Sequence, residues 1–272
     1  MVTMSNVWDR TTDVLRGRGG ILASIAVATL FLPAIVSNAV TLFLMPGSTT
    51  FVMVGAVVTI VVLLLSMWGQ LVLVAVASDP ETTRTQAAAR ATARFPALIA
   101  VSIIAFLVLL LLFVPIGAAI GMSGIDFAAV TRTGAMPNIG RGTITFLSLY
   151  GLMILIAGLF VGVRMVLLNA VVLNERLALG AFRRSWSLTR GLTWRLVGVV
   201  VLYVIVVGVA ASAAQFVSGA IVGLIADSAT TTAFLASVVA AVVTTIFSVV
   251  AAVFTAQLYV AVTQRGIATV FA

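Results

Sequence analysis

Three polar side chains interrupt long apolar stretches of this sequence, and they are the first candidates for chemistry. Gln70, Arg164 and Gln257 are spaced almost evenly, and each stands between two runs of apolar residues. An ionisable group within a membrane-spanning segment often marks the path of a substrate or an ion. Together with Gln215, these residues form a hypothetical intramembrane polar cluster, in which glutamine carbonyl oxygens surround the guanidinium of Arg164.

Arg164 has a second interpretation, at the membrane interface. The apolar segment Ile144–Leu173 is longer than the roughly 20 residues that cross a bilayer, and counting from its outer end brings Arg164 to the inner interface. An unpaired arginine at the bilayer centre costs at least about 2.5–3.5 kcal/mol, and no Asp or Glu lies within an apolar segment. We favour the interface, where a lipid phosphate can pair with the guanidinium. The predicted lipid or phosphate contacts are Arg164, Arg183, Arg184, Arg190 and Arg195.

The side chains that most enzymes use are missing from the sequence. It contains no His, Cys or Lys, which excludes Ser-His-Asp triads, thiol and lysine nucleophiles, and His or Cys ligands for a metal or haem. A carboxylate proton relay across the membrane is not expected either, because the acidic residues lie outside the apolar segments. We therefore expect a protein that is not an enzyme and that has no catalytic residue, metal or cofactor.

The composition identifies the elements that must position the polar side chains. With 62% hydrophobic and 8% charged residues, the chain is far from the roughly one quarter of charged residues that soluble proteins carry. Apolar runs of about 18 residues or more predict transmembrane helices. The sequence contains six such runs: Ile21–Met45, Phe51–Ala77, Ala97–Ile120, Ile144–Leu173, Leu196–Ala226 and Phe234–Val262.

The placement of the arginines predicts the orientation in the membrane. Most arginines precede the first apolar run, follow the last, or lie between the second and third and between the fourth and fifth. The opposite side carries only Arg132 and Arg141. By the positive-inside rule, both termini are cytoplasmic. This orientation also accounts for the net charge of +8, so we expect no nucleic-acid partner.

The sequence also predicts a repeated unit. Each unit consists of a short cytoplasmic amphipathic helix, a span going out, an outer loop and a span coming back. The predicted amphipathic helices run from about Asn6 to Arg16, from Asp79 to Pro96, and from about Leu177 to Arg190, with Asp79 as an N-cap. The whole chain, 1–272, is then one transmembrane domain with three hairpin repeats, at about 5–78, 79–176 and 177–265.

The stretch from Arg164 to Arg195 resembles the signature of the membrane-domain family of glycerophosphoryl diester phosphodiesterases. That pattern has an Arg in a long helix, an apolar run to an acidic residue, and then Ala-x-x-Arg-Ser-x-x-Leu-Thr-x-Gly-x-x-Trp-Arg. The matching residues are Arg164, Glu175, Ala181, Arg184, Ser185, Leu188, Thr189, Gly191, Trp194 and Arg195. The segment from Trp8 to Ala34 is similar to small stand-alone bacterial members. The resemblance implies a six-span bacterial membrane domain without the catalytic domain, whose paired His and metal-binding carboxylates are absent.

Together these patterns predict an all-α polytopic protein of the bacterial cytoplasmic (inner) membrane. We expect a non-enzymatic scaffold, or an accessory subunit of a membrane complex, in contact with anionic lipid and with other integral membrane proteins. The alternative is a small transporter or channel that moves a lipid-like or small anionic solute along the repeat axis. A transporter predicts a hydrated cavity that reaches Arg164 or Gln215, whereas a scaffold predicts a filled core and an apolar outer face.

Overall fold

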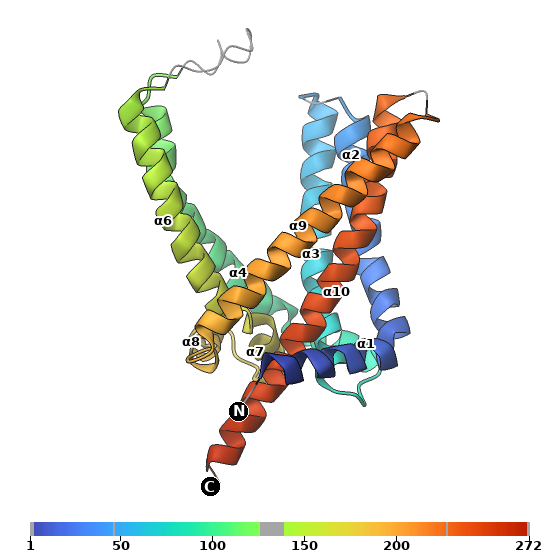
Figure 1. Ribbon diagram of the computed structural model, residues 1–272, viewed down its shortest axis with the longest axis vertical. Coiled ribbons are helices and arrows are strands. Elements are labelled where there is room, and N and C mark those ends of the chain that lie inside the picture. The colour runs from blue at the N-terminus through green and yellow to red at the C-terminus, as the bar shows by residue number, and fades with distance from the viewer. Residues whose placement is uncertain (1–2, 46, 126–138, 227, 271–272) are drawn as a thin grey trace.

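Apolar runs fold into helices throughout the part of the chain that the computed structural model describes, residues 3–45, 47–125, 139–226 and 228–270 (Figure 1). A helix pairs its own backbone N–H and C=O groups, as a lipid environment requires. The elements are α1 (Met4–Ala26), the π-helical turn η1 (Val27–Phe31), α2 (Leu32–Phe43), α3 (Thr49–Ser78), α4 (Arg84–Gly121), α6 (Arg141–Met165), α7 (Leu168–Asn174), α8 (Gly180–Leu188), α9 (Thr193–Gly223) and α10 (Ala229–Val270).

Six helical stretches are long and apolar enough to cross a membrane. They are Met4–Phe43, Thr49–Ser78, Arg84–Gly121, Arg141–Asn174, Thr193–Gly223 and Ala229–Gln264. This confirms the predicted all-helical class and the six apolar helices of a multi-pass membrane protein. Of the arginines that predict the orientation, Arg132 and the side chain of Arg265 lie outside the described part of the chain.

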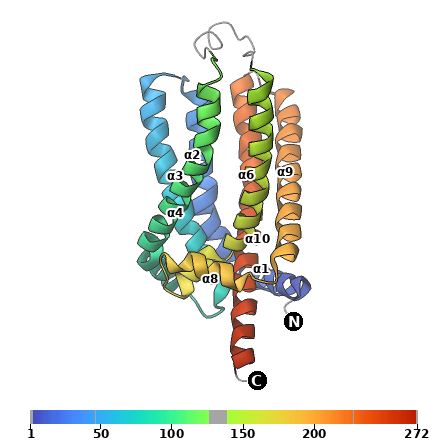
Figure 2. The same cartoon turned by 90° about the vertical axis from the view of Figure 1, so that its left-hand side faces the viewer.

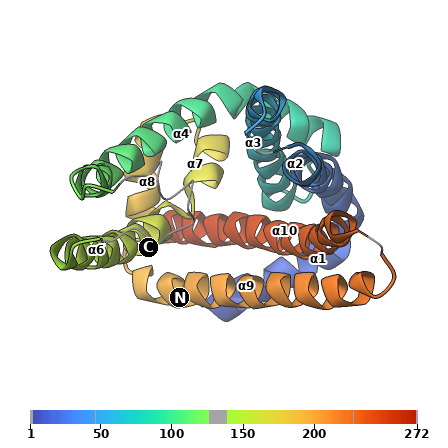
Figure 3. The same ribbon diagram turned by 90° about the horizontal axis from the view of Figure 1, so that it is seen from above.

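The core of the molecule lies at one end of the bundle. Buried side chains concentrate in residues 71–77 of α3, 170–173 of α7 and most of residues 252–259 of α10. The short helix α7 lies between α4 and α10 when the molecule is seen from above (Figure 3), and it packs against α3, α4, α8 and α10. We call this region the core end. It brings residues from three long helices, α3, α4 and α10, and from the short helix α8 next to α7.

Toward the opposite end the helices separate. In Figure 1, α4 and α6 diverge from α2, α3 and α10 as a two-helix arm. Tyr150 of α6 donates a hydrogen bond to the carbonyl of Leu112 in α4, 3.0 Å away, and residues 103–114 of α4 are all apolar and all exposed. Most of the surface of this arm is therefore available to lipid or to another membrane helix.

The first span is a composite helix with a close contact to α3. The start of α1 lies across the core end before the chain turns upward through η1 into α2 (Figures 1 and 2). The turn follows a segment with three glycines, Gly17, Gly19 and Gly20, and glycine favours bends in long helices. Thr29 in η1 then packs so closely on Gly69 that a Cβ atom there would lie 2.1 Å from the Thr29 hydroxyl oxygen.

Two of the three predicted amphipathic helices are not separate elements. The first is part of α1, and the predicted start of the second at Asp79 is wrong, because α4 begins only at Arg84. Thr83 and Gln86 form a capping box at that start, and α4 continues through Pro96 to Gly121. Asp79 instead caps the C-terminal end of α3. The third predicted helix corresponds to α8, which is separate and lies across the core end (Figure 2).

Candidate functional site

Arg164 lies in the last turn of α6 and contacts α8. Its guanidinium carbon is 4.8 Å from the centre of the Trp186 ring and 5.2 Å from that of the Phe160 ring. One terminal nitrogen donates to the Trp186 carbonyl at 3.3 Å. Cation–π contacts contribute about 0.5–2 kcal/mol each. The charge of Arg164 is therefore stabilised by two aromatic rings and a carbonyl, without a carboxylate partner among the described residues.

The backbone of Arg164 is held by α8 as well. Its carbonyl accepts a hydrogen bond from the Ser185 hydroxyl at 2.7 Å and a longer one from the Thr189 hydroxyl at 3.4 Å. The α6 helix ends one residue later, so this carbonyl belongs to the last turn, whose acceptors lack helical partners. Ser185 in α8 and Thr189, the C-cap of α8, are one turn apart, and both are fully buried. Their hydroxyls face the end of α6 and supply the hydrogen bonds that the Arg164 carbonyl lacks within the helix.

A second polar contact joins α7, α8 and α10. The Nε of Arg184 donates to both oxygens of Glu175, at 2.7 and 3.0 Å, and the Tyr259 hydroxyl donates to one of them at 3.2 Å. Glu175 is the C-cap of α7. We call these seven residues the α8 clasp: Arg164, Glu175, Arg184, Ser185, Trp186, Thr189 and Tyr259. All polar members of the sequence signature except Arg195 thus join these helix ends to one another.

The remaining arginines of the predicted lipid contact lie near the clasp and are exposed. Arg183, Arg190 and Arg195 form no ion pair with any residue that the structure describes. Trp194 is 81% exposed beside them in the sequence, and Trp186 is 39% exposed. We call Arg183, Arg190, Arg195 and Trp194 the basic surface. By contrast, Arg184 pairs with Glu175, and Arg164 contacts Trp186 and Phe160, although its buried Nε has no hydrogen-bond partner among the described residues.

The C-terminal end of α3 is closed by two side chains that are far apart in the sequence. Arg18 donates to the carbonyls of Val76 and Asp79, at 2.6 and 2.8 Å, and also to that of Thr82. Gln257 donates to the carbonyl of Ala77 at 2.6 Å. A cation suits the negative end of a helix dipole. Sequence reasoning used Arg18 only for orientation, and its position among three glycines just before the first apolar run was the available signal.

The Asp79 carboxylate joins α3 to α4 just beyond this end. It accepts hydrogen bonds from the Thr82 hydroxyl at 2.8 Å and from the Glu81 backbone N–H at 3.0 Å, and Arg90 lies 3.4 Å away. These hydrogen bonds and the Arg90 charge hold the pKa of Asp79 below its ordinary value. The segment between α3 and α4 is thereby fixed by local hydrogen bonds rather than by a continuing helix.

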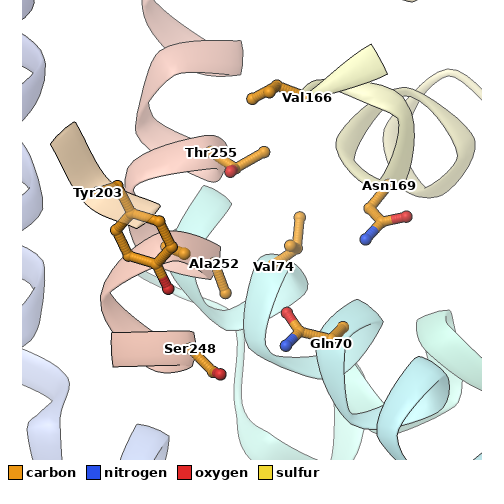
Figure 4. Close-up of a pocket in the computed structure, with 9 residues that line it drawn as sticks. Gln70, Val74, Val166, Asn169, Tyr203, Ser248, Ala252 and Thr255 are labelled. Atoms are coloured by element: carbon orange, nitrogen blue, oxygen red, sulfur yellow. The ribbon is translucent and has the colours of Figure 1, made fainter. Parts of the chain in front are cut away.

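Gln70 lines a cavity of about 210 Å³ near the core end (Figure 4). The other lining residues come from α3, α7, α9, α10 and the turn after α6, and they are Val74, Val166, Asn169, Tyr203, Ser248, Ala251, Ala252 and Thr255. None of the lining residues is Asp, Glu or Arg. In Figure 4 the amides of Gln70 and Asn169 lie on one side, and the hydroxyls of Tyr203, Ser248 and Thr255 on the other.

The four members of the predicted polar cluster have different surroundings. Arg164 contacts α8, Gln257 contacts the end of α3, and Gln70 lines the cavity. Gln215 is exposed on α9, where its backbone carbonyl accepts a hydrogen bond from the Ser218 hydroxyl at 3.3 Å. Within the described residues no hydrogen bond joins any two of the four. Their shared feature is a polar group in a long apolar helix.

Comparison with known proteins identifies a family and no activity. The sequence model described as "Domain of unknown function (DUF7847)" matches residues 9–262. No curated protein and no solved structure matches the chain. The matched range includes the α8 clasp, the basic surface and the cavity. The resemblance to the membrane domain of glycerophosphoryl diester phosphodiesterases stays a prediction.

Proposed function

Because the chain belongs to the family described as Domain of unknown function (DUF7847), whose description names no activity, we propose its function from its geometry. It is a non-enzymatic protein of the bacterial cytoplasmic membrane, and it acts as a scaffold or as an accessory subunit of a membrane complex. Its partners are other integral membrane proteins, and anionic lipid binds at its cytoplasmic surface.

The proposed topology has the core end on the cytoplasmic side and six spans paired as three hairpins. Three observations support it. The start of α1, the end of α10 and α8 all lie toward the core end (Figures 1 and 2). The exposed arginines Arg183, Arg190 and Arg195 lie there too, where positive-inside placement requires them. Within each proposed hairpin the two spans pack together: α2 with α3, α4 with α6, and α9 with α10.

The α4–α6 arm is the observation that carries the proposal of a protein partner. An 18-residue stretch within Arg84–Gly121 has a mean hydropathy of 3.3, the highest such value among the six segments, and residues 103–114 expose apolar side chains on every face. At the core end, in contrast, α7 packs against α3, α4, α8 and α10, and most of the buried side chains lie there. Membrane helices associate through close packing, and a protruding pair of helices offers a partner more surface than a helix inside the bundle.

The partner proposal is tested by purification from native membranes in mild detergent. We expect an integral membrane protein to copurify in constant proportion, and we expect Leu107→Trp in α4 to reduce that proportion about tenfold, because overpacking of an interface costs about 1–3 kcal/mol. Leu202→Trp in α9 is the matched control, since Leu202 is exposed to a similar extent. Recovery of the chain as a monomer, or equal losses with both variants, would overturn the proposal.

The alternative, a small transporter or channel for a lipid-like or small anionic solute along the repeat axis, has weaker support. Its predicted cavity reaches Arg164 or Gln215, and neither residue lines the cavity at Gln70. That cavity also offers no cation to an anionic solute. We therefore retain the scaffold or accessory subunit as the proposed function.

A further inference from the structure

The cavity at Gln70 brings five polar side chains together inside a bundle of apolar helices. They are Gln70 of α3, Asn169 of α7, Tyr203 of α9, and Ser248 and Thr255 of α10. These elements are separated widely in the sequence, and they converge from opposite sides on one space (Figure 4). Polar side chains are costly in membrane helices unless they find hydrogen-bond partners. The polar side chains around the cavity therefore need hydrogen-bond partners.

Protein partners satisfy only part of this polar lining. Tyr203 donates to the carbonyl of Phe247 at 3.0 Å, and Ser248 donates to that of Thr244 at 2.8 Å. Both oxygens keep lone pairs that can accept. The side chains of Gln70, Asn169 and Thr255 make no hydrogen bond to any described residue. The space of about 210 Å³ is large enough to hold several water molecules or a small polar group that would satisfy them.

The chemistry of the lining selects the kind of occupant. No residue around the cavity carries a full charge, so a phosphate or carboxylate would find no cation and an ammonium group no carboxylate. Each amide and each hydroxyl can both donate and accept. The groups that match this property are hydroxyls, which also do both. Val74, Val166 and Ala252 supply apolar wall for the carbon skeleton of such an occupant.

We propose that this cavity binds an uncharged polyhydroxyl group, which is either the sugar headgroup of a glycolipid or a free polyol. Its size fits one small group, because sites for drug-sized ligands have volumes of about 300–1,000 Å³. The site is separate from the α4–α6 arm. Loss of the protein partner would leave this binding unchanged, and failure to bind a polyhydroxyl group would leave the accessory-subunit proposal standing.

The absence of cysteine from the sequence allows a direct test. Ser248→Cys places a thiol at the cavity, and Val253→Cys places one on the same helix at a fully buried position. In purified protein, we expect a hydrophilic methanethiosulfonate reagent to modify the Ser248→Cys variant at least about tenfold faster, because reaction requires a hydrated thiolate. Equal rates would show a dry, closed cavity and would overturn the proposal. Thr255→Cys repeats the measurement if Ser248→Cys alters the melting temperature.

Protection from modification identifies the occupant. The probes are free sorbitol, nanodiscs of phosphatidylethanolamine with or without monogalactosyldiacylglycerol, and inorganic phosphate as the charged control. We expect sorbitol or the glycolipid to slow modification at least about threefold and phosphate to have no effect. Sorbitol protection assigns a free polyol, and protection by the glycolipid alone assigns a lipid headgroup. Protection by neither, or equal protection by phosphate, would overturn the proposal.

Gln70 provides the control for specificity. In a Gln70→Leu, Ser248→Cys variant we expect rapid modification to persist while the protection is lost, because leucine fills similar space without the amide. Asn6→Leu, at an exposed position of α1, is the control substitution and should keep the protection. Protection that survives Gln70→Leu would contradict binding at this amide.

Discussion

At the scale of single residues, Gly69 is a position where the structure leaves no room for a side chain. A Cβ atom there would lie 2.1 Å from the Oγ1 and 2.5 Å from the Cβ of Thr29, and Thr29 is buried in η1. We expect Gly69→Ala to lower the free energy of unfolding by about 1–3 kcal/mol or more, the usual cost of overpacking. The measurement is the melting temperature in detergent.

Gly55 is the matched control for this substitution. It lies in the same helix, and an added Cβ would meet nothing within 4 Å. Gly55→Ala should leave the melting temperature unchanged or raise it slightly, because alanine favours the helix over glycine. If both variants melt at the same temperature, the contact between Thr29 and Gly69 does not constrain the fold.

A second prediction at this scale concerns the hydrogen bonds of Arg18. Its guanidinium satisfies three carbonyls at and beyond the end of α3, and leaving buried acceptors without partners costs about 1–3 kcal/mol. Arg18→Gln should therefore lower the melting temperature clearly, whereas Arg16→Gln, at an exposed position two residues earlier, should not. Equal effects of the two substitutions would mean that the charge of α1, rather than these hydrogen bonds, matters.

At the scale of elements, the α8 clasp connects helix ends that the sequence places far apart. The hydroxyls of Ser185 and Thr189 both reach the carbonyl of Arg164. A Ser185→Ala, Thr189→Val double variant should free α8 from α6, and limited proteolysis should then cut the segment between α7 and α9 several times faster. Ser187→Ala, at an exposed position of the same helix, should leave the cleavage rate unchanged. Unchanged cleavage in the double variant would contradict a clasp.

The element scale also shows what sequence patterns could predict. The apolar runs predicted every long helix, because membrane helices need about 20 apolar residues wherever they occur. The local capping signals gave a wrong helix start at Asp79, where an N-cap residue is followed by a proline and an acidic residue. Thr83 and Gln86 form the capping box at the observed start of α4, and the Asp79 carboxylate accepts hydrogen bonds within the preceding turn. The sequence around Asp79 and the sequence around Thr83 both resemble a helix start. The packing of α4 against α3 is consistent with the start at Arg84.

The candidate site was predicted less well, for a related reason. A polar residue in an apolar run is visible in the sequence, so Gln70, Arg164 and Gln257 were found. Their partners were not, because Trp186, Ala77 and the cavity walls are brought near them only by tertiary folding. Asn169, Ser248 and Thr255 were missed because a single amide or hydroxyl in a membrane helix is common and carries no signal of its own.

At the scale of the whole molecule, the orientation is open to a test that uses the same cysteine-free background. Arg141 at the start of α6 and Arg190 beyond α8 are both exposed, and they lie on opposite sides of the proposed membrane. In intact spheroplasts, a membrane-impermeant maleimide should label Arg141→Cys, and it should label Arg190→Cys only after the membrane is made permeable. The reverse pattern would invert the proposed topology, and labelling of both without permeation would contradict the proposed spans.

The closed end of α3 has a consequence for how the protein is made. Its carbonyls are satisfied by Arg18, near the beginning of the chain, and by Gln257, close to the end of the last span. A ribosome synthesises Arg18 before α3, and it synthesises Gln257 180 residues after Ala77. During synthesis, the carbonyl of Ala77 therefore lacks this partner until the last of the six spans has been made, so the first hairpin alone cannot complete the core.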